Sequence, residues 1–174
     1  MINTKRLNAQ EVVIEDSLGL LKCFNNPNVI KYLTLPQLKK ETEIINFIKI
    51  NYLSYKRRCE YPSLAIHYKD TKECIGVMEI HNENEYKGAE IGIYIQEEYW
   101  NKGIGQEAIE ALVNYGFSTL GLHRLEMLIV EDNLGCKTLV KNCGFKYEGT
   151  LSDYILLNDR YNNVEVYSII NKEK

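Results

Sequence analysis

Apolar residues along this chain recur first at the spacing of a strand and then at the spacing of helices. Over the first third, the pattern predicts one strand and three helical segments, at residues 6–12, 17–24, 29–33 and 40–58. A side-chain oxygen of Asp16 or Ser17 is expected to cap the first helix. In the longest segment, apolar residues share one side at helical spacing: Ile44, Ile45, Ile48, Tyr52 and Tyr55. These helices are expected either to cover a core or to line a pocket.

Strand-like segments dominate the rest of the chain. Residues 63–68 and 74–81 flank a polar turn and predict a hairpin. The later segments are predicted as strand 89–95, helix 106–118, strand 124–130, helix 136–143, strand 145–151, and a hairpin of 154–157 with 164–170. The order β-α-α-β-β-β-α-β-α-β-β predicts a mixed α/β domain with antiparallel and parallel parts.

Composition and charge narrow the class of protein. The 174 residues fit a single domain, expected over 1–174, and 45 % hydrophobic with 26 % charged residues is typical of a globular protein. No apolar run reaches the roughly 18 residues of a membrane span, and the first residues do not resemble a secretory signal. The five cysteines form no C-x-x-C pair, which favours reduced thiols over disulfides or zinc. A net charge of −3 argues against nucleic-acid binding and favours a cationic substrate. We therefore expect a cytoplasmic protein without a metal, membrane or nucleic-acid partner.

The most informative segment joins the strand at 89–95 to the helix at 106–118. Its polar turn ends in Gly103 and Gly105, which open an amphipathic helix. The first N–H groups of a helix lack partners, and the helix dipole places partial positive charge there. Glycines let this backbone approach a pyrophosphate closely, so the loop is a candidate phosphate site. A tight turn without a ligand would explain the two glycines equally well.

The same glycines formally match the dinucleotide-binding fingerprint of the Rossmann fold. Gly103, Gly105 and Ala108 have the spacing G-x-G-x-x-A, and Glu126 follows about 20 residues later. That fingerprint places its glycines directly after the strand, whereas residues 96–102 intervene here. It also needs repeated βαβ units downstream, for which too little chain remains. We therefore reject this interpretation.

A known family matches the whole arrangement. Residues 100–105, Trp-Asn-Lys-Gly-Ile-Gly, resemble the coenzyme-A loop Q/R-x-x-G-x-G/A of the GNAT acetyltransferase superfamily. The segment from Asn133 through Cys136 to Gly144 and Phe145 resembles that family's N-x-x-[SA]…G-F helix and strand. Further segments resemble the branch of ribosomal-protein N-terminal acetyltransferases (RimJ/RimL type): residues 89–92, 99–103, 123–125, 148–151, 159–161 and 166–168. The resemblance runs through nearly the whole chain in the right order.

This resemblance implies the GNAT fold, a mixed and mostly antiparallel sheet with a splayed parallel strand pair and helices on both faces. It also implies that an amine attacks acetyl-coenzyme A directly, without an acetyl-enzyme intermediate. The strand of Ile93, Tyr94 and Ile95 would part from residues 125–130. Its freed backbone groups would then bond the pantetheine arm and polarise the thioester.

The cofactor contacts that the family implies lie mostly on the glycine loop. They are Trp100, Asn101, Lys102, Gly103, Ile104, Gly105 and Gln106 over the pyrophosphate, and Asn133 on the pantetheine arm. Lys102, Lys137 and Lys141 are candidates for the 3′-phosphate, although each is at least as well explained as a surface lysine. Trp100 stands where the superfamily usually has Gln or Arg.

Two residues are candidates for proton transfer. Glu90 is the candidate base because its strand borders the expected acceptor channel, although strand alternation could turn it away and it could be an ordinary ion pair. Glu79 and His81 on the neighbouring strand are the alternatives. Val140 replaces the tyrosine that many members use as the acid. Cys136 is the candidate acid in its place, or it packs as a small hydrophobic residue.

The acceptor is the least determined part of the function. An α-amino group has a pKa near ~8, against ~10.4 for lysine, so an N-terminal amine needs only a weak base. The sequence therefore favours acetyl transfer to a protein N-terminal α-amine, as on a ribosomal protein. The alternatives are a small-molecule amine (polyamine, aminoglycoside or amino acid) and a catalytically silent acyl-coenzyme-A-binding protein. A homodimer is expected from the branch.

Overall fold

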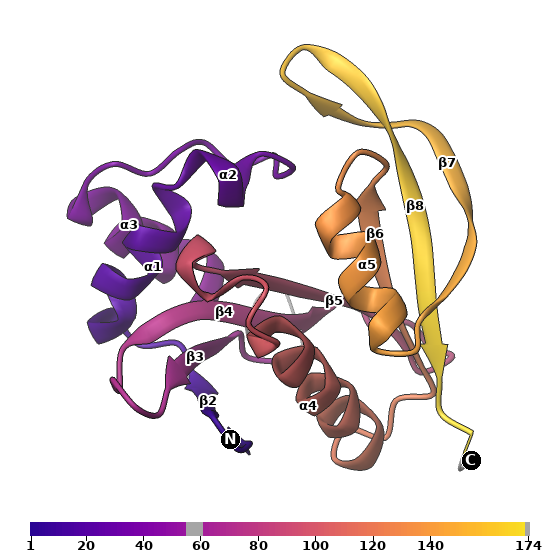
Figure 1. The fold of residues 1–174 in the computed structure, drawn as a ribbon, viewed down its shortest axis with the longest axis horizontal. Coiled ribbons are helices and arrows are strands. Elements are labelled where there is room, and N and C mark those ends of the chain that lie inside the picture. The colour runs from indigo at the N-terminus through magenta and orange to yellow at the C-terminus, as the bar shows by residue number, and fades with distance from the viewer. Residues whose placement is uncertain (55–60, 173–174) are drawn as a thin grey trace.

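One sheet of eight strands organises the described residues, 1–54 and 61–172, of this computed structural model (Figure 1). Across the sheet the strands follow the order β1-β2-β3-β4-β5-β6-β8-β7. Their bounds are β1 Ile2–Asn3, β2 Leu7–Glu11, β3 Leu64–Tyr68, β4 Cys74–His81, β5 Gly88–Ile95, β6 Arg124–Val130, β7 Lys146–Leu157 and β8 Arg160–Ile170. Among these strands, neighbours run antiparallel except β5 and β6. The mixed α/β fold predicted from the sequence is confirmed.

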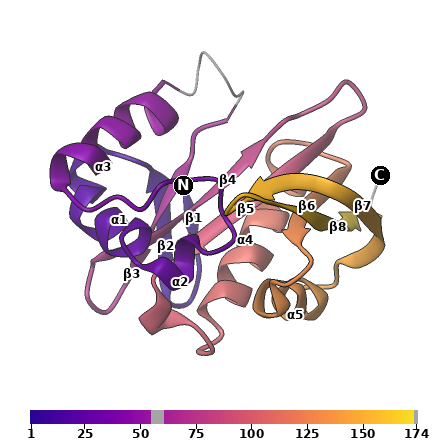
Figure 2. The same ribbon diagram turned by 90° about the horizontal axis from the view of Figure 1, so that it is seen from above.

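Helices cover both faces of the sheet, with α1 and α3 on one face and α4 and α5 on the other (Figure 2). The helices are α1 Ser17–Phe24, α2 Pro27–Ile30, α3 Glu41–Phe47, α4 Ile104–Ser118 and α5 Leu134–Asn142. Short helical turns are η1 Ile14–Asp16, η2 Ile48–Tyr52 and η4 Glu97–Tyr99. Across the part of the chain that is described, no helix combines the length and the apolar character that crossing a membrane would require.

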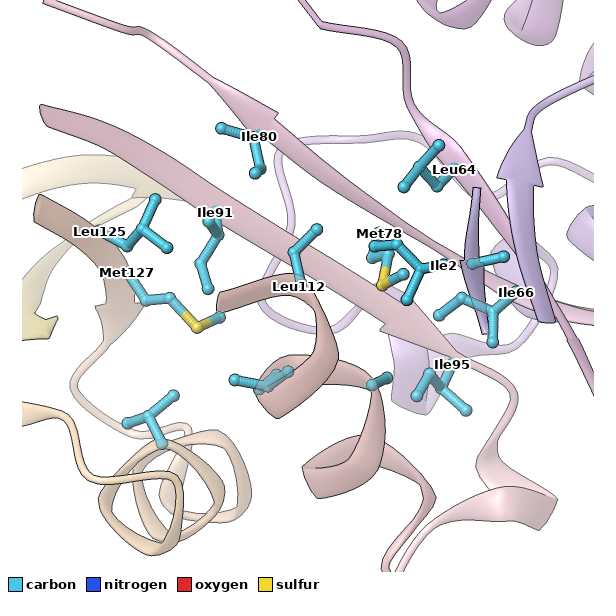
Figure 3. Close-up of a cluster of buried hydrophobic side chains, with 14 of the residues drawn as sticks. Ile2, Leu64, Ile66, Met78, Ile80, Ile91, Ile95, Leu112, Leu125 and Met127 are labelled. Carbon is cyan, nitrogen blue, oxygen red and sulfur yellow. The ribbon is translucent and has the colours of Figure 1, made fainter. Parts of the chain in front are cut away.

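Strand alternation divides the side chains of the sheet between two cores. The core beneath α4 and α5 includes Ile80, Ile91, Leu112, Leu125 and Met127 (Figure 3). The core beneath α1 and α3 includes Phe24, Ile44, Val77 and the partly buried Tyr94. Successive strand residues point to opposite faces. Glu79, Glu90 and Glu126 therefore share the face of α1 and α3.

The long C-terminal strand and the third helix differ from the sequence prediction. Residues 145–151 and 154–157 were expected as two strands, but both belong to β7 because both pair with β8, with a register shift between Leu151 and Ile155. The helix expected at 40–58 is α-helical only to Phe47 and continues as the π-helical turn η2. Residues 55–58 of that prediction, with Tyr55, lie outside the described part of the chain.

The expected cap of α1 is also wrong. Asp16 precedes the helix, but no side-chain hydrogen bond caps it. One carboxylate oxygen of Asp16 accepts the N–H of Val13 at 2.9 Å, and the other pairs with His67 Nε2 at 2.8 Å. Asp16 is buried, and a buried carboxylate needs such partners. The side chain therefore ties the start of α1 to β3 instead of capping the helix.

The parallel pair of β5 and β6 is joined over only part of its length. The register runs from Gly88 with Arg124 to Glu90 with Glu126. Beyond that point β5 stays paired with β4 as far as Ile95, and β6 stays paired with β8 as far as Val130. The two strands diverge (Figure 1), and each leaves one backbone edge without a neighbouring strand. The splay expected from the family resemblance is confirmed.

β7 forms one edge of the sheet and exposes several large apolar side chains, Tyr147, Leu151, Tyr154 and Leu156. An exposed apolar edge strand favours pairing with another chain. The homodimer stays a prediction, and β7 is the surface on which we expect it.

The packing of α1 on β4 gives a test of the fold. A Cβ added at Gly19 would lie 2.1 Å from the backbone oxygen of Cys74, so the helix would have to move. We expect Gly19→Ala to lower the free energy of unfolding by about 2 kcal/mol or more, measured by urea denaturation. Gly149→Ala is the matched control, because a Cβ there meets nothing within 4 Å. Equal stability of the two variants would contradict this packing.

Candidate active site

The loop between η4 and α4 presents backbone donors at the end of β5. Asn101 and Gly103 both have left-handed backbone conformations, with φ of 56° and 72°, which asparagine and glycine tolerate best. Gly103 is the N-cap of α4 and offers no side chain to the first N–H groups of the helix. Trp100 fixes the start of the loop, because its Nε1–H donates to the oxygen of Ile95 at 2.8 Å. The loop therefore has the shape and polarity of an anion site.

Arg6 holds this loop from the other end of the sequence. Its Nη1 donates to the carbonyl oxygen of Lys102 at 2.9 Å, and its Nε donates to Glu107 in the first turn of α4 at 2.6 Å. Arg6 was not among the site residues predicted from the sequence. The contact spans about a hundred positions, and an isolated arginine beside β2 carries no local signal for it.

Each splayed strand leads into a helix, β5 through η4 into α4 and β6 into α5 (Figure 1). Along β5, Ile93 and Ile95 pack into the core of α4 and α5, whereas the ring of Tyr94 lies 5.7 Å from that of Phe24 in α1. The side chains of β5 are thus packed against helices on both faces of the sheet. The backbone edge that faces β6 is left for a ligand.

Glu79 is placed beside this edge on the face of α1 and α3. It pairs across β4 and β5 with Gly92, two residues beyond the end of the parallel pairing. A Cβ at Gly92 would lie 3.4 Å from a carboxylate oxygen of Glu79 and 3.6 Å from the hydroxyl of Tyr94. The glycine therefore leaves the space that the glutamate occupies. Ser63 Oγ donates to the other carboxylate oxygen at 3.1 Å.

Two tyrosines, the buried Tyr52 and the partly buried Tyr94, lie near the same carboxylate. Burial first, and then the charge of Glu79 and a hydrogen bond to it, raise the pKa of Tyr94. Burial and next the charge of Glu79 also raise the pKa of Tyr52. Both hydroxyls therefore keep their protons at neutral pH and are available as donors. The site holds a partly buried carboxylate among hydrogen-bond donors, which suits the binding and deprotonation of an ammonium group.

Glu79 is the first of four glutamates on this face of the sheet, and we call them the glutamate row: Glu79 on β4, Glu90 on β5, Glu126 on β6 and, beyond β8, Glu148 on β7. Glu90 accepts a hydrogen bond from Asn82 at 2.9 Å. Arg124 donates to Glu126 at 2.7 Å and to Glu148 at 2.6 and 2.8 Å. The bonds from Arg124, followed by one from Ser168, lower the pKa of Glu148 to about 2. Within the described residues, the Arg124 guanidinium thus pairs with two of the four carboxylates, those of Glu126 and Glu148.

Comparisons with known proteins now decide the family. Residues 6–146 match the acetyltransferase (GNAT) domain. The chain belongs to the GNAT acetyltransferase family. An uncharacterized N-acetyltransferase of Bacillus subtilis, YoaA, is 32 % identical over 173 residues, which cover 98 % of this chain and 96 % of that protein.

Solved GNAT structures have the same fold. A GNAT-family acetyltransferase from Bacillus anthracis has a TM-score of 0.85 at 22 % identity, covering 97 % of each chain. The spermidine N-acetyltransferase of Vibrio cholerae, in complex with CoA and spermine, has a TM-score of 0.81 at 23 % identity, covering 96 % of each chain. These identities show the fold alone. The family match and the N-acetyltransferase relative show that this protein is an acetyl-coenzyme-A-dependent N-acetyltransferase, whereas the RimJ/RimL branch stays a prediction.

The GNAT site fits acetyl-coenzyme A at three points. The left-handed Gly103 and the start of α4 suit the pyrophosphate, and the free edge of β5 suits the pantetheine amides. Asn133 begins α5, where its side-chain oxygen Oδ1 accepts the N–H of Cys136 at 3.2 Å. Its amide group is the part that remains to bond the pantetheine arm. When bound, the cofactor supplies an acetyl group activated as a thioester.

The three lysines predicted for the 3′-phosphate are already engaged to different degrees. Lys137 forms an ion pair with Glu165 at 2.8 Å, with both side chains largely buried. Lys141 lies over the ring of Tyr167, and Lys102 lies over that of Tyr99. Lys137 would have to give up its partner, so Lys102 and Lys141 are the better candidates.

Cys136 and Val140 both lie on α5 beside the core of α4. Val140 is fully buried and offers no proton. Burial raises the pKa of the Cys136 thiol to about 12, so the thiol keeps its proton at neutral pH. Transfer of that proton to a thiolate with an ordinary pKa near ~8.5 would be uphill. A hydrogen bond from Cys136 to the leaving sulfur is the role that fits its burial.

In the part of the chain that the structure describes, one cluster of potential metal ligands lies outside this site. Asp16, His67 and Cys74 bring ligand atoms within 4.8 Å of one another. Asp16 and His67 already form a pair, and burial raises the pKa of the Cys74 thiol to about 12. Structural zinc sites normally need four ligands and deprotonated thiols. An ion pair beside a neutral thiol therefore explains the cluster.

The glycine loop can be tested with two substitutions of nearly equal shape. Asparagine and aspartate both tolerate the left-handed conformation of Gly103, but only aspartate adds a charge. We expect Gly103→Asp to bind acetyl-coenzyme A at least about tenfold more weakly than Gly103→Asn, through repulsion of the pyrophosphate. Isothermal titration calorimetry measures the difference. Equal affinities would show that the pyrophosphate lies elsewhere.

Proposed function

We propose that this N-acetyltransferase acetylates an aliphatic amine with more than one positive charge, such as a polyamine. The glutamate row carries this proposal. It begins at Glu79 beside the splayed strands and continues over β5, β6 and β7, where Arg124 is the counter-charge. A flexible chain of ammonium groups can meet several carboxylates in succession. Each contact would lower the cost of bringing the cation to the reacting edge.

A protein N-terminal α-amine is the second candidate, and it was preferred on sequence alone. That preference rested on the absence of an evident strong base. Glu79 beside Gly92 removes this ground for preferring an α-amine, because its carboxylate can deprotonate a more basic amine. The observation that still favours a peptide is the group of exposed apolar side chains on β7 and β8, Leu151, Tyr154, Leu156 and Tyr161.

In the proposed mechanism, side chains on the face of Glu79 handle the proton of the amine, and the backbone of β5 stabilises the thioester. Glu79 takes a proton from the incoming ammonium group, directly or through water, which frees the nitrogen lone pair for attack. Ser63 and Tyr94 donate to Glu79 and hold its orientation. Backbone N–H groups of β5 stabilise the negative charge that develops on the carbonyl oxygen. As the carbon–nitrogen bond forms and the carbon–sulfur bond breaks, the nitrogen loses its second proton, the departing thiolate takes up a proton, and the Cys136 thiol hydrogen-bonds that sulfur.

The acceptor class is tested by a direct competition. We expect the kcat/KM for spermidine to exceed that for short peptides with free N-termini at least about tenfold, because only the polyamine uses the glutamate row. Release of coenzyme A is followed with a thiol reagent, and enzyme without acceptor corrects for the cysteines of the protein. A preference for peptides would overturn the polyamine proposal in favour of the α-amine.

The base is tested by comparing two glutamates of the row. We expect Glu79→Gln to lower kcat about 10²-fold or more through loss of the general base. Glu90→Gln is expected to raise the KM for spermidine with little change in kcat, because it removes only a charge that binds the substrate. Steady-state kinetics of both variants give the answer. The opposite pattern would return the base role to Glu90, as the sequence first suggested.

The role of Cys136 is tested in the same assay. Cys136→Ala should lower kcat about tenfold, the value of one hydrogen bond made in the transition state. Cys136→Ser keeps a donor at this position and should keep most of the activity. Acetyl-coenzyme A affinity should stay nearly unchanged in both variants. A Cys136→Ala enzyme with the kcat of the original protein would exclude the donor role.

A further inference from the structure

The segment that covers the acceptor face contacts both β5 and the residues directly before α5. Residues 17–33, which we call the acceptor wall, run from α1 through α2 across the face that carries Glu79. At one end the ring of Phe24 contacts that of Tyr94 on β5. At the other end the hydroxyl of Tyr32 donates to the carbonyl oxygen of Asp132 at 3.0 Å, directly before α5 begins. The wall therefore spans the gap between the two splayed strands.

Gln96, the first residue after β5, fixes the wall at α1. Its side chain is buried, and its amide donates to the carbonyl oxygens of Gly19 at 2.9 Å and Cys74 at 3.1 Å. Its own N–H donates to the oxygen of Ile75 at 2.9 Å. A buried amide with all of these partners cannot shift without losing several hydrogen bonds. The start of the cofactor loop and α1 thus form one unit.

Glu97, the next residue, fixes the wall at α2. Its two carboxylate oxygens accept hydrogen bonds from Asn26 and Asn28, each at 2.8 Å. Asn26 also begins α2, because its side-chain oxygen accepts the N–H of Asn28 at 2.9 Å. One carboxylate therefore holds the first turn of α2, while the chain that follows it is the loop of Trp100 to Gly103. Bonds to a charged group of this kind are stronger than neutral ones.

We propose that Gln96 and Glu97 act as a joint that couples the cofactor loop to the acceptor wall. When the pyrophosphate orders the loop, the joint orders α1 and α2, and the acceptor side of the site is completed. Coupling of this kind is reciprocal, so an amine bound against the wall would also strengthen cofactor binding. Glu97 is then a positioning residue. The joint rests on the proposed function in one respect, the assumption that the amine binds against residues 17–33.

Hydrogen–deuterium exchange with coenzyme A as the probe tests the joint without knowledge of the acceptor. In the original protein, coenzyme A should slow amide exchange both in residues 101–108 and in residues 19–33, the latter at least about fivefold. In Glu97→Gln, which removes the charge and one acceptor, the slowing at 101–108 should persist while that at 19–33 is lost. Glu98→Gln is the matched control, since Glu98 takes no part in the joint, and it should behave as the original protein.

A second variant removes one of the same hydrogen bonds by changing the acceptor wall instead of Glu97. Asn28→Ala removes one donor to Glu97 and should also lose the transmitted slowing, while its melting temperature reports that the fold is intact. In kinetics, both variants should raise the KM for spermidine about fivefold or more with little change in kcat. Glu97→Asp keeps the carboxylate and should therefore partly restore both the transmitted slowing and the KM.

The outcomes separate this inference from the proposed function. If coenzyme A slows exchange nowhere in the original protein, the cofactor assignment itself fails. If coenzyme A slows exchange in residues 101–108 but not in residues 19–33, the proposed joint is wrong and the acetyltransferase assignment stands. If Glu97→Gln loses the slowing in both segments, Glu97 supports the cofactor loop alone, and the joint is again overturned.

Discussion

The pairing of β5 with β6 stops at Glu90, and the chemistry of the site depends on that interruption. Backbone N–H and C=O groups in the interior of a protein require partners. Here β5 continues to Ile95 and β6 to Val130 with one edge each unpaired by strands. A ligand that carries amides can complete those edges, as an additional strand would. The fold therefore provides a slot for a pantetheine arm by leaving a sheet incomplete.

The incomplete sheet also separates the two substrates. On one side, the loop of Asn101 and Gly103 and the start of α4 present backbone donors for an anion. On the other side, the glutamate row presents carboxylates for a cation. In the proposed mechanism the reacting atoms meet at the edge between them, near Gly92, where the lack of a side chain leaves room for Glu79. Opposite charges on opposite faces allow both substrates to bind without competing for the same groups.

The sequence predicted the parts of this arrangement that local patterns encode. The pattern around Gly103 and Gly105 predicted the strand before the loop and the helix after it, and the family resemblance predicted the splay. The contacts of Arg6, Gln96 and Glu97 were not predictable, because they join segments about seventy or more positions apart through polar side chains with no periodicity. Asp16 was misassigned for a related reason. A carboxylate before a helix usually caps it, but burial against His67 gave this one a different partner.

The choice between Glu79 and Glu90 depended on register, which a single sequence leaves open. Both lie on the same face, and the register shows that Glu79 lies opposite Gly92, beyond the paired segment, whereas Glu90 is the last residue of β5 that pairs with β6. A crystal structure of the complex with coenzyme A tests the central claim most directly. The account predicts pantetheine amides bonded to the backbone of residues 91–95 and the pyrophosphate at the N–H groups following Gly103. A cofactor bound on the face of Glu79, or away from the splayed strands, would contradict it.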